Sequence, residues 1–250
     1  MHDYYPSRKR GFTLIETLLA IGVLTVLLTG FMMVFGPAVA GIRKALNVEE
    51  VDRIASTLEQ EMVTLRSGSA APTLKTGFAK AFEWILKSNS ATDAILVYQY
   101  RGKLDSLRAD GTPTPCPVIK GLLPGKDYVV QTMVRRKSEV ANFTADLPAI
   151  EGGIYFVKCT QLVFSTVTTT PGLILGTIGT IKDPKGTTTY TAPDGTPPYP
   201  EAVVAFAADF YTLPAKSSAY FSTNFNSLFN NASPTGSKKP VFTRNLAVRR

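Results

Sequence analysis

The sequence of 250 residues contains one histidine and two cysteines. The histidine, His2, stands in a short leader ahead of a long apolar stretch. Histidine is the usual acid–base group near neutral pH, the base of Ser-His-Asp and Cys-His sites, and a common zinc ligand. Its scarcity excludes these enzyme classes and His-ligated zinc. No other catalytic spacing is present, so we expect neither an enzyme nor a cofactor.

Charge is missing from one long segment. No residue from Thr17 to Ile42 is charged, and about 20 helical residues suffice to cross the hydrocarbon layer of a membrane. The basic run from Arg8 to Arg10 lies just before it, which favours a cytoplasmic amino terminus. The sequence therefore predicts a single span, with the chain after Arg43 on the far side of the membrane.

Glu16 is the exception at the edge of this segment. A carboxylate inside a membrane span costs about 2.5–3.5 kcal/mol on insertion scales. Such a residue calls for a partner that neutralises it.

Two ordinary alternatives account for an apolar amino-terminal segment. Ala38-Val39-Ala40 before Gly41 fits a secretory cleavage site, although the apolar core from Leu18 to Phe35 is longer than secretory cores usually are. The second alternative is a plain single-span anchor in which Glu16 is incidental.

A third interpretation uses all of these features together. The motif Gly11-Phe12-Thr13-Leu14-Ile15-Glu16, after a basic leader and before an apolar span, resembles the prepilin cleavage and methylation motif of type IV pilins and type II secretion pseudopilins. The resemblance covers about the first 55 residues. It implies cleavage between Gly11 and Phe12 by a prepilin peptidase, methylation of the Phe12 amino group, and no catalytic activity of the chain itself.

The resemblance also implies partners and a location. Glu16 would pair with the charged Phe12 amine of a neighbouring subunit, because a paired charge is tolerated in an apolar helix bundle and can fix register. The protein would be an inner-membrane, periplasm-facing filament subunit, more a minor than a major one, assembled with other subunits by inner-membrane machinery. A membrane-tethered binding or sensory domain is the alternative function.

Apolar residues continue at helical spacing beyond the span. Val48, Val51, Ala55, Leu58, Met62 and Leu65 follow a 3-4-3-4-3 spacing, with Glu59 and Glu61 among the charged residues on other faces. We expect one helix from Phe12 to about Arg66; a separate surface helix after a loop is the alternative. The predicted divisions are a leader (1–11), a membrane helix (12–42), an amphipathic stalk (43–66) and a head (67–250).

The head is predicted to be α+β, with an antiparallel sheet packed on the long helix. A short helix is expected from Leu74 to Lys87. Strands are expected where Val, Ile, Thr and aromatic residues gather between turn signals: Ala94–Tyr100, Tyr128–Arg135, Ile154–Cys159, Gln161–Thr169, Val203–Tyr211 and Val241–Val248.

Two polar regions interrupt this pattern. Residues 165–200 are rich in Thr, Gly and Pro, which predicts an exposed hairpin or a long variable loop. In Ser217–Lys239, the residues Phe221, Phe225, Leu228 and Phe229 share one helical face. We expect that face to pack on the head, with a contact surface for another subunit as the alternative.

The remaining candidate sites are weak. Cys116 and Cys159 would lie outside the cytoplasm, where they either form a disulfide or stay separate, and two cysteines cannot complete a zinc site. Asp183–Gly186 and Asp194-Gly195 are typical of turns, and we expect no metal there. The formal net charge is +8, but the cluster Arg135-Arg136-Lys137 is expected to be solvated surface, and no nucleic-acid binding is expected.

Overall fold

The computed structural model describes residues 13–65, 76–165 and 172–250, without the side chains of residues 34 and 36–49. The chain divides into two compact units, Met1–Val51 and Asp52–Arg250. The expected leader, with Gly11, and the adjacent Phe12 lie outside the described residues. The described chain has an α+β architecture: an amino-terminal apolar helix is followed by an antiparallel sheet with several helices.

Helix α1 runs without a break from Leu14 to Val63. The alternative of a separate surface helix after a loop is therefore wrong. Ala55, Leu58 and Met62 are buried in the head, as expected of the apolar stripe, and Ile54, which the stripe did not include, is buried with them. Leu65 was expected in that stripe but is half exposed, because the helix ends two residues earlier.

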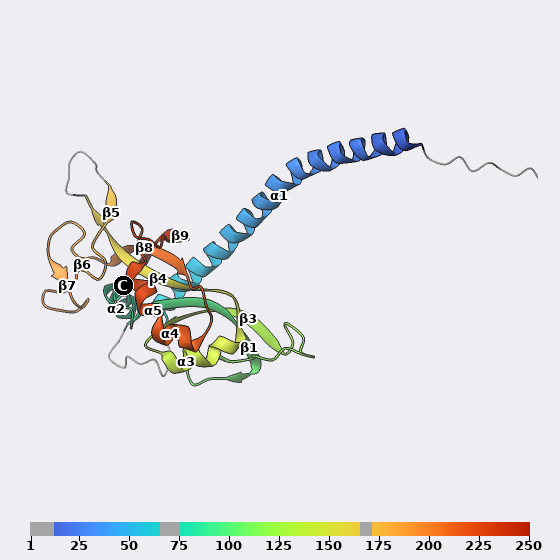
Figure 1. Ribbon diagram of the computed structural model, residues 1–250. Coiled ribbons are helices and arrows are strands. Elements are labelled where there is room, and N and C mark those ends of the chain that lie inside the picture. Colours follow the sequence, from blue (N-terminus) through green and yellow to red (C-terminus); the bar gives the residue numbers. More distant parts are fainter. Residues whose placement is uncertain (1–12, 66–75, 166–171) are drawn as a thin grey trace, which may run out of the picture. The chain divides into compact units, whose positions relative to one another are not determined.

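The central sheet is antiparallel throughout, with the main spatial order β3-β1-β4-β8-β9 (Figure 1). Two short strands extend it, β2 beside the far end of β1 and β5 beside the far end of β4. The bounds are β1 Ile95–Leu107, β2 Pro113–Pro115, β3 Tyr128–Arg136, β4 Ile150–Phe164, β5 Leu173–Leu175, β8 Val203–Thr212 and β9 Phe242–Arg249.

The two strands expected at Ile154–Cys159 and Gln161–Thr169 are one strand, β4, within the described residues. The expected ranges left a break at Thr160, yet the strand continues through it and the next residue, Gln161, is buried. Its side-chain amide donates to the carbonyl of Lys182 at 2.7 Å, and its side-chain oxygen accepts from the Lys182 amide at 2.7 Å. The side chain thus pairs with backbone as a strand would, which allows its burial.

Side chains alternate between two apolar cores, one on each face of the sheet. Ile95 and Val97 face the core formed with α1 and α2 (Gly77–Leu86), whereas Leu96 and Tyr98 face the core on the other side. The second core is covered by α3 (Val140–Asp146), a 3-10 turn (Leu147–Ala149), α4 (Ser218–Thr223) and α5 (Phe225–Asn231) (Figure 1).

The expected helical face in Ser217–Lys239 does pack on the head. Phe221, Phe225 and Phe229 are buried in the second core, and Leu228 packs against it. Helix α3 had no expected counterpart in the sequence. Helices therefore cover both faces of the sheet, whereas the prediction was a sheet packed on the long helix.

The region 165–200 agrees with expectation in part. Strand β5 forms a hairpin with β4, and its three apolar side chains are exposed. The following hairpin, β6 (Ile181–Lys182) with β7 (Thr189–Tyr190), instead sends apolar groups inward. Ile181, Tyr190 and Tyr199 are buried in the core beside α2, so the description of this whole region as exposed is wrong.

The expected solvated patch at Arg135-Arg136 is also wrong, because both arginines are buried. Arg135 pairs with Asp110 at 2.9 Å and with the fully buried Asp146 at 3.2 Å. Asp146 also accepts from Arg108 at 2.5 Å and from the Tyr98 hydroxyl at 2.5 Å. This ionic cluster joins α3 to the sheet, and the charges of these arginines are neutralised internally.

The carboxyl end of α1 is held by a buried lysine of α2. The ammonium of Lys80 donates to the carbonyls of Glu61 and Thr64, both at 2.6 Å, and lies 3.5 Å from the Glu61 carboxylate. A cation at this end donates to the last carbonyls of the helix and complements its dipole. Glu61 was expected on a solvent-facing side of the stalk; the structure buries it with Lys80.

The two helices approach closely at this junction. A side chain on Gly77, the first residue of α2, would meet the carbonyl oxygen of Val63 at 2.1 Å. Only glycine fits there without a backbone shift. Lys80 and Gly77 together fix where α1 ends in the head.

We expect Lys80→Met to lower the free energy of unfolding by about 3 kcal/mol, because it leaves helix carbonyls and a buried carboxylate without their cation. Lys87→Met, at the cap position directly after the same helix, is the matched control. Lys87 is half exposed and pairs with Glu83 four residues before it, so its loss should cost about 0.5 kcal/mol or less. Urea unfolding of the full chain in detergent, followed by circular dichroism, measures both; equal losses would contradict the assigned role.

Asp110 gives the ionic cluster a predictable pH dependence. Burial favours a higher pKa of its carboxyl, but hydrogen bonds from Thr112 and Arg135 and the charge of Arg135 outweigh burial, so the pKa lies below its usual value. Stability from a lowered carboxyl pKa is complete above the unfolded value of about 3.9 and is lost as the pH falls through the folded value.

Asp110→Asn should therefore be less stable than the natural chain at pH 7, and the gap should narrow below about pH 4. Unfolding midpoints measured from pH 7 down to pH 2 check this. Asp105→Asn, at an exposed position of β1, should leave the curve unchanged. A gap that stays constant at every pH would show that the Asp110 charge is not responsible.

Candidate functional site

The first turn of α1 carries Glu16, the one expected assembly residue that the structure describes. Thr13 precedes the helix and caps it: the Glu16 amide donates to the Thr13 hydroxyl at 3.3 Å and to its carbonyl at 3.1 Å. The pattern Thr-x-x-Glu is the sequence of a capping box. It places a carboxylate at the amino end of the helix, where the dipole favours negative charge.

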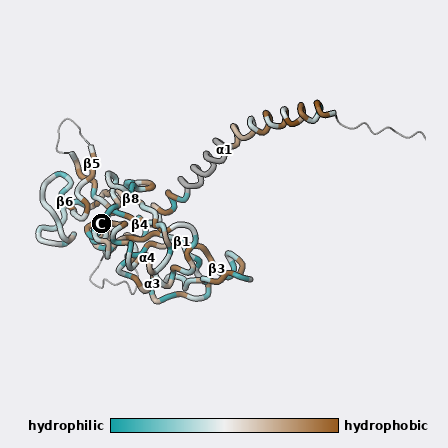
Figure 2. Tube along the Cα trace, in the orientation of Figure 1, coloured by the Kyte–Doolittle hydropathy of each residue, from teal (hydrophilic) through white to brown (hydrophobic). Residues whose placement is uncertain are grey.

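The helix surface around Glu16 is apolar and uncovered. Leu14–Met33 is long and apolar enough to cross a membrane, with a mean hydropathy of 2.1, and none of its residues is buried within the chain. Figure 2 shows this part of α1 coloured mostly as hydrophobic. These properties are those of a membrane-anchored, single-pass protein.

The threonines of this stretch satisfy their own hydroxyls. Thr17, Thr25 and Thr29 each donate to a carbonyl one turn earlier in the helix, at 2.8 Å. In lipid, where water is absent, such internal bonds remove the cost of a polar side chain. These three threonines therefore do not conflict with a position inside the membrane.

Glu16 differs from them. Within the described residues its carboxylate is exposed and makes neither an ion pair nor a side-chain hydrogen bond. It is thus the one polar side chain of Leu14–Met33 that the described part of the chain leaves unsatisfied. The expected cleavage residues Gly11 and Phe12 lie outside that part, so the structure does not place them relative to Glu16.

A shallow apolar groove follows one face of the same helix. Its lining residues recur at helical spacing: Ile15, Leu18, Leu19, Gly22, Val23, Val26 and Leu27. Gly22 lacks a side chain, and no other group lies within 4 Å of where a Cβ would stand. A notch of this kind allows another helix to approach closely. The groove begins beside Glu16, at the neighbouring Ile15.

The two cysteines are separate free thiols. Cys116 follows β2, and its thiol lies 3.3 Å from the Val118 carbonyl. Cys159 lies in β4, in the core beside α1 and α2, where burial raises the pKa of its thiol to about 12. A thiol with so high a pKa is unreactive at neutral pH.

The expected turns do form turns. In Asp183–Gly186, the Lys185 amide donates to the Asp183 carboxylate at 2.9 Å and the Gly186 amide to the Asp183 carbonyl at 3.1 Å. The described part of the chain holds no group of three or more His, Cys, Asp or Glu residues arranged to hold a metal ion.

One arrangement of polar residues was not predicted from the sequence. Lys158 and Asp209 are directly opposite one another on β4 and β8, and with Tyr211 they line a cavity on the sheet face that carries the second core. The signal in the sequence is the alternation of these polar residues with Cys159, Ala208 and Phe210 inside two strongly apolar strands.

Comparison with known families adds one match. Residues 6–32 match the family model described as the prokaryotic N-terminal methylation motif, which is the signature of type IV pilins and pseudopilins. The motif implies processing by a prepilin peptidase and assembly with other pilin subunits. No curated protein and no solved structure matches the chain.

Proposed function

We propose that this protein is a structural filament subunit, a minor pilin or pseudopilin, rather than an enzyme. The observation that carries the proposal is Glu16. It stands inside the matched motif, in the first turn of a helix able to span a membrane, and among the polar side chains of Leu14–Met33 it is the one without a partner in the described residues.

Processing supplies the missing partner. Cleavage between Gly11 and Phe12 creates a new primary amino group on Phe12, and its methylation gives a secondary amine that is still basic. The free amine of a mature subunit is a cation at the tip of the apolar helix. A Glu16 carboxylate that would be costly alone in an apolar bundle is tolerated when it is paired with that cation.

The pairing is between subunits. A neighbouring helix that packs into the groove from Ile15 to Leu27 brings its own amino terminus toward this first turn. Apolar contact along the groove does not by itself fix how far one helix is shifted along its neighbour. The ion pair fixes this axial register. Assembly by inner-membrane machinery would draw these helices from the lipid into the filament.

Location follows from the span. With the basic residues from Arg8 to Arg10 on the cytoplasmic side, the head lies in the periplasm. The head is large for a bulk subunit and is built on its own two-sided core. This favours a minor subunit, present in few copies, over the major one.

The mature amino terminus distinguishes this function from its alternatives. Amino-terminal sequencing and intact mass of the purified protein should give methyl-Phe12. An intact leader would favour a membrane-tethered binding or sensory domain, and a mature chain beginning at Gly41 would favour secretion.

Glu16→Gln tests the ion pair. The variant should insert and be processed normally, since cleavage takes place at Gly11, but its amount in sheared filaments should fall at least tenfold. Glu59→Gln, further along α1 within the head unit, is the matched control and should assemble normally. Normal incorporation of the Glu16 variant would refute the register role while leaving membrane anchoring intact.

A further inference from the structure

The cavity lined by Lys158, Asp209 and Tyr211 is independent of the membrane helix. Its volume is about 360 Å³, which is within the usual range for sites that bind small molecules. Its floor is formed by β4 and β8, and its walls by the end of α5, the turn Ala232–Thr235 and the segment after β5. Exposed residues at the rim, among them Leu175 and Pro234, leave it open to solvent.

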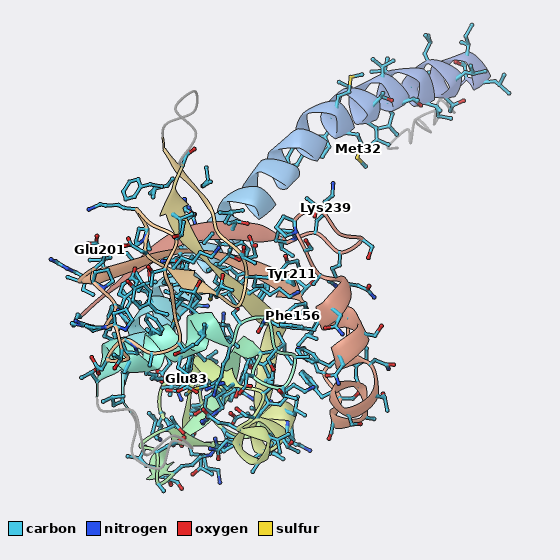
Figure 3. The ribbon with its side chains drawn as sticks, turned by 90° about the vertical axis from the view of Figure 1, so that its left-hand side faces the viewer. Met32, Glu83, Phe156, Glu201, Tyr211 and Lys239 are labelled. Carbon is cyan, nitrogen blue, oxygen red and sulfur yellow. The ribbon has the colours of Figure 1, made fainter. Side chains whose placement is uncertain are left out.

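Tyr211 gives the first sign of a ligand. Its side chain is fully buried and its ring is stacked on Phe156, with 5.0 Å between ring centroids. Figure 3 shows these two labelled side chains next to one another. Tyr211 lines the cavity together with Lys158 and Asp209, and its hydroxyl has no hydrogen-bond partner among the described residues. Buried hydroxyls are almost always hydrogen-bonded, so this one needs a partner from outside the chain.

Lys158 is only partly satisfied. Its ammonium donates to the Ala232 carbonyl at 2.6 Å and lies over the Phe229 ring, 4.3 Å from the centroid. An ammonium has three N–H donors, so one remains for a ligand. Burial lowers the pKa of Lys158, which indicates that its protein partners do not fully replace water.

Asp209, opposite Lys158 on the neighbouring strand, supplies a negative charge to the cavity. One carboxylate oxygen accepts from the Thr243 hydroxyl at 2.5 Å, and the side chain is almost wholly buried. Although Asp209 is opposite Lys158 in the sheet, the two make no ion pair within the part of the chain that the structure describes. Burial raises the pKa of Asp209 despite the nearby lysine.

The two charges restrict the ligand. An anion without a positive group would face the Asp209 carboxylate, and a cation without a negative group would face the Lys158 ammonium. A zwitterion satisfies both. We propose that this cavity binds a free α-amino acid with an apolar side chain.

The assignment of groups follows from the lining. The ligand carboxylate accepts from the Lys158 ammonium and from the Tyr211 hydroxyl, and the ligand ammonium donates to Asp209. Thr160, on the same face of β4, offers a further hydroxyl. The apolar side chain lies against Leu175, Ile178 and Pro234.

Saturation-transfer NMR on the full chain in detergent tests the proposal with L-leucine and L-phenylalanine as probes. Two analogues of leucine serve as matched controls: 4-methylpentanoate lacks the amine, and 3-methylbutylamine lacks the carboxylate. Leucine or phenylalanine should bind. The affinity of each singly charged analogue should be at least about tenfold lower than that of leucine, because one buried charge is left unpaired.

Tyr211→Phe separates binding from folding. Because its hydroxyl has no partner in the described chain, its removal should leave the thermal midpoint unchanged or raised, while amino-acid binding weakens about tenfold. Tyr190→Phe, a buried tyrosine of the opposite core, should leave binding unchanged. The proposal is overturned if neither amino acid binds, if an analogue binds as well as leucine, or if Tyr211→Phe binds as the natural chain does.

Discussion

The junction between Lys80 and the carboxyl end of α1 is the interaction on which the head depends. This helix ends inside the head, so its last carbonyls are buried there and need donors from another part of the chain. Lys80 satisfies the carbonyls of Glu61 and Thr64, and Gly77 lets the next helix begin against Val63. The sheet then packs on a helix whose end is fixed.

The two ends of α1 have different surroundings. Toward Val63 its apolar residues are buried in the head, whereas from Leu14 to Met33 none is buried. Its threonines donate to the helix backbone, so the one side chain left without a partner in the described part of that stretch is Glu16. In our proposal, the head is stable through its own packing, and the unsatisfied carboxylate is reserved for contact between subunits.

The head contains two kinds of buried charge, and they differ in use. Arg135 and Asp146 have partners on several sides and hold α3 to the sheet. Lys158 and Asp209 are opposite one another on neighbouring strands. In the described residues they make no ion pair, and the Tyr211 hydroxyl in the same cavity has no hydrogen-bond partner. Charges that pair with one another stabilise a fold, whereas opposite charges that line a cavity without pairing indicate room for a ligand.

The sequence by itself determined the apolar span, the motif from Gly11 to Glu16, the buried stripe of Ala55, Leu58 and Met62, and most strands, because these depend on local order and on periodicity along one chain. Only the tertiary structure decided the burial of Arg135, Arg136 and Tyr199, the separation of Cys116 from Cys159, and the continuity of β4 through Gln161. Each depends on a partner distant in sequence: Asp110 and Asp146 for Arg135, or the Lys182 backbone for Gln161. The cost of burying a polar group is set by such partners, and residue type alone does not reveal them.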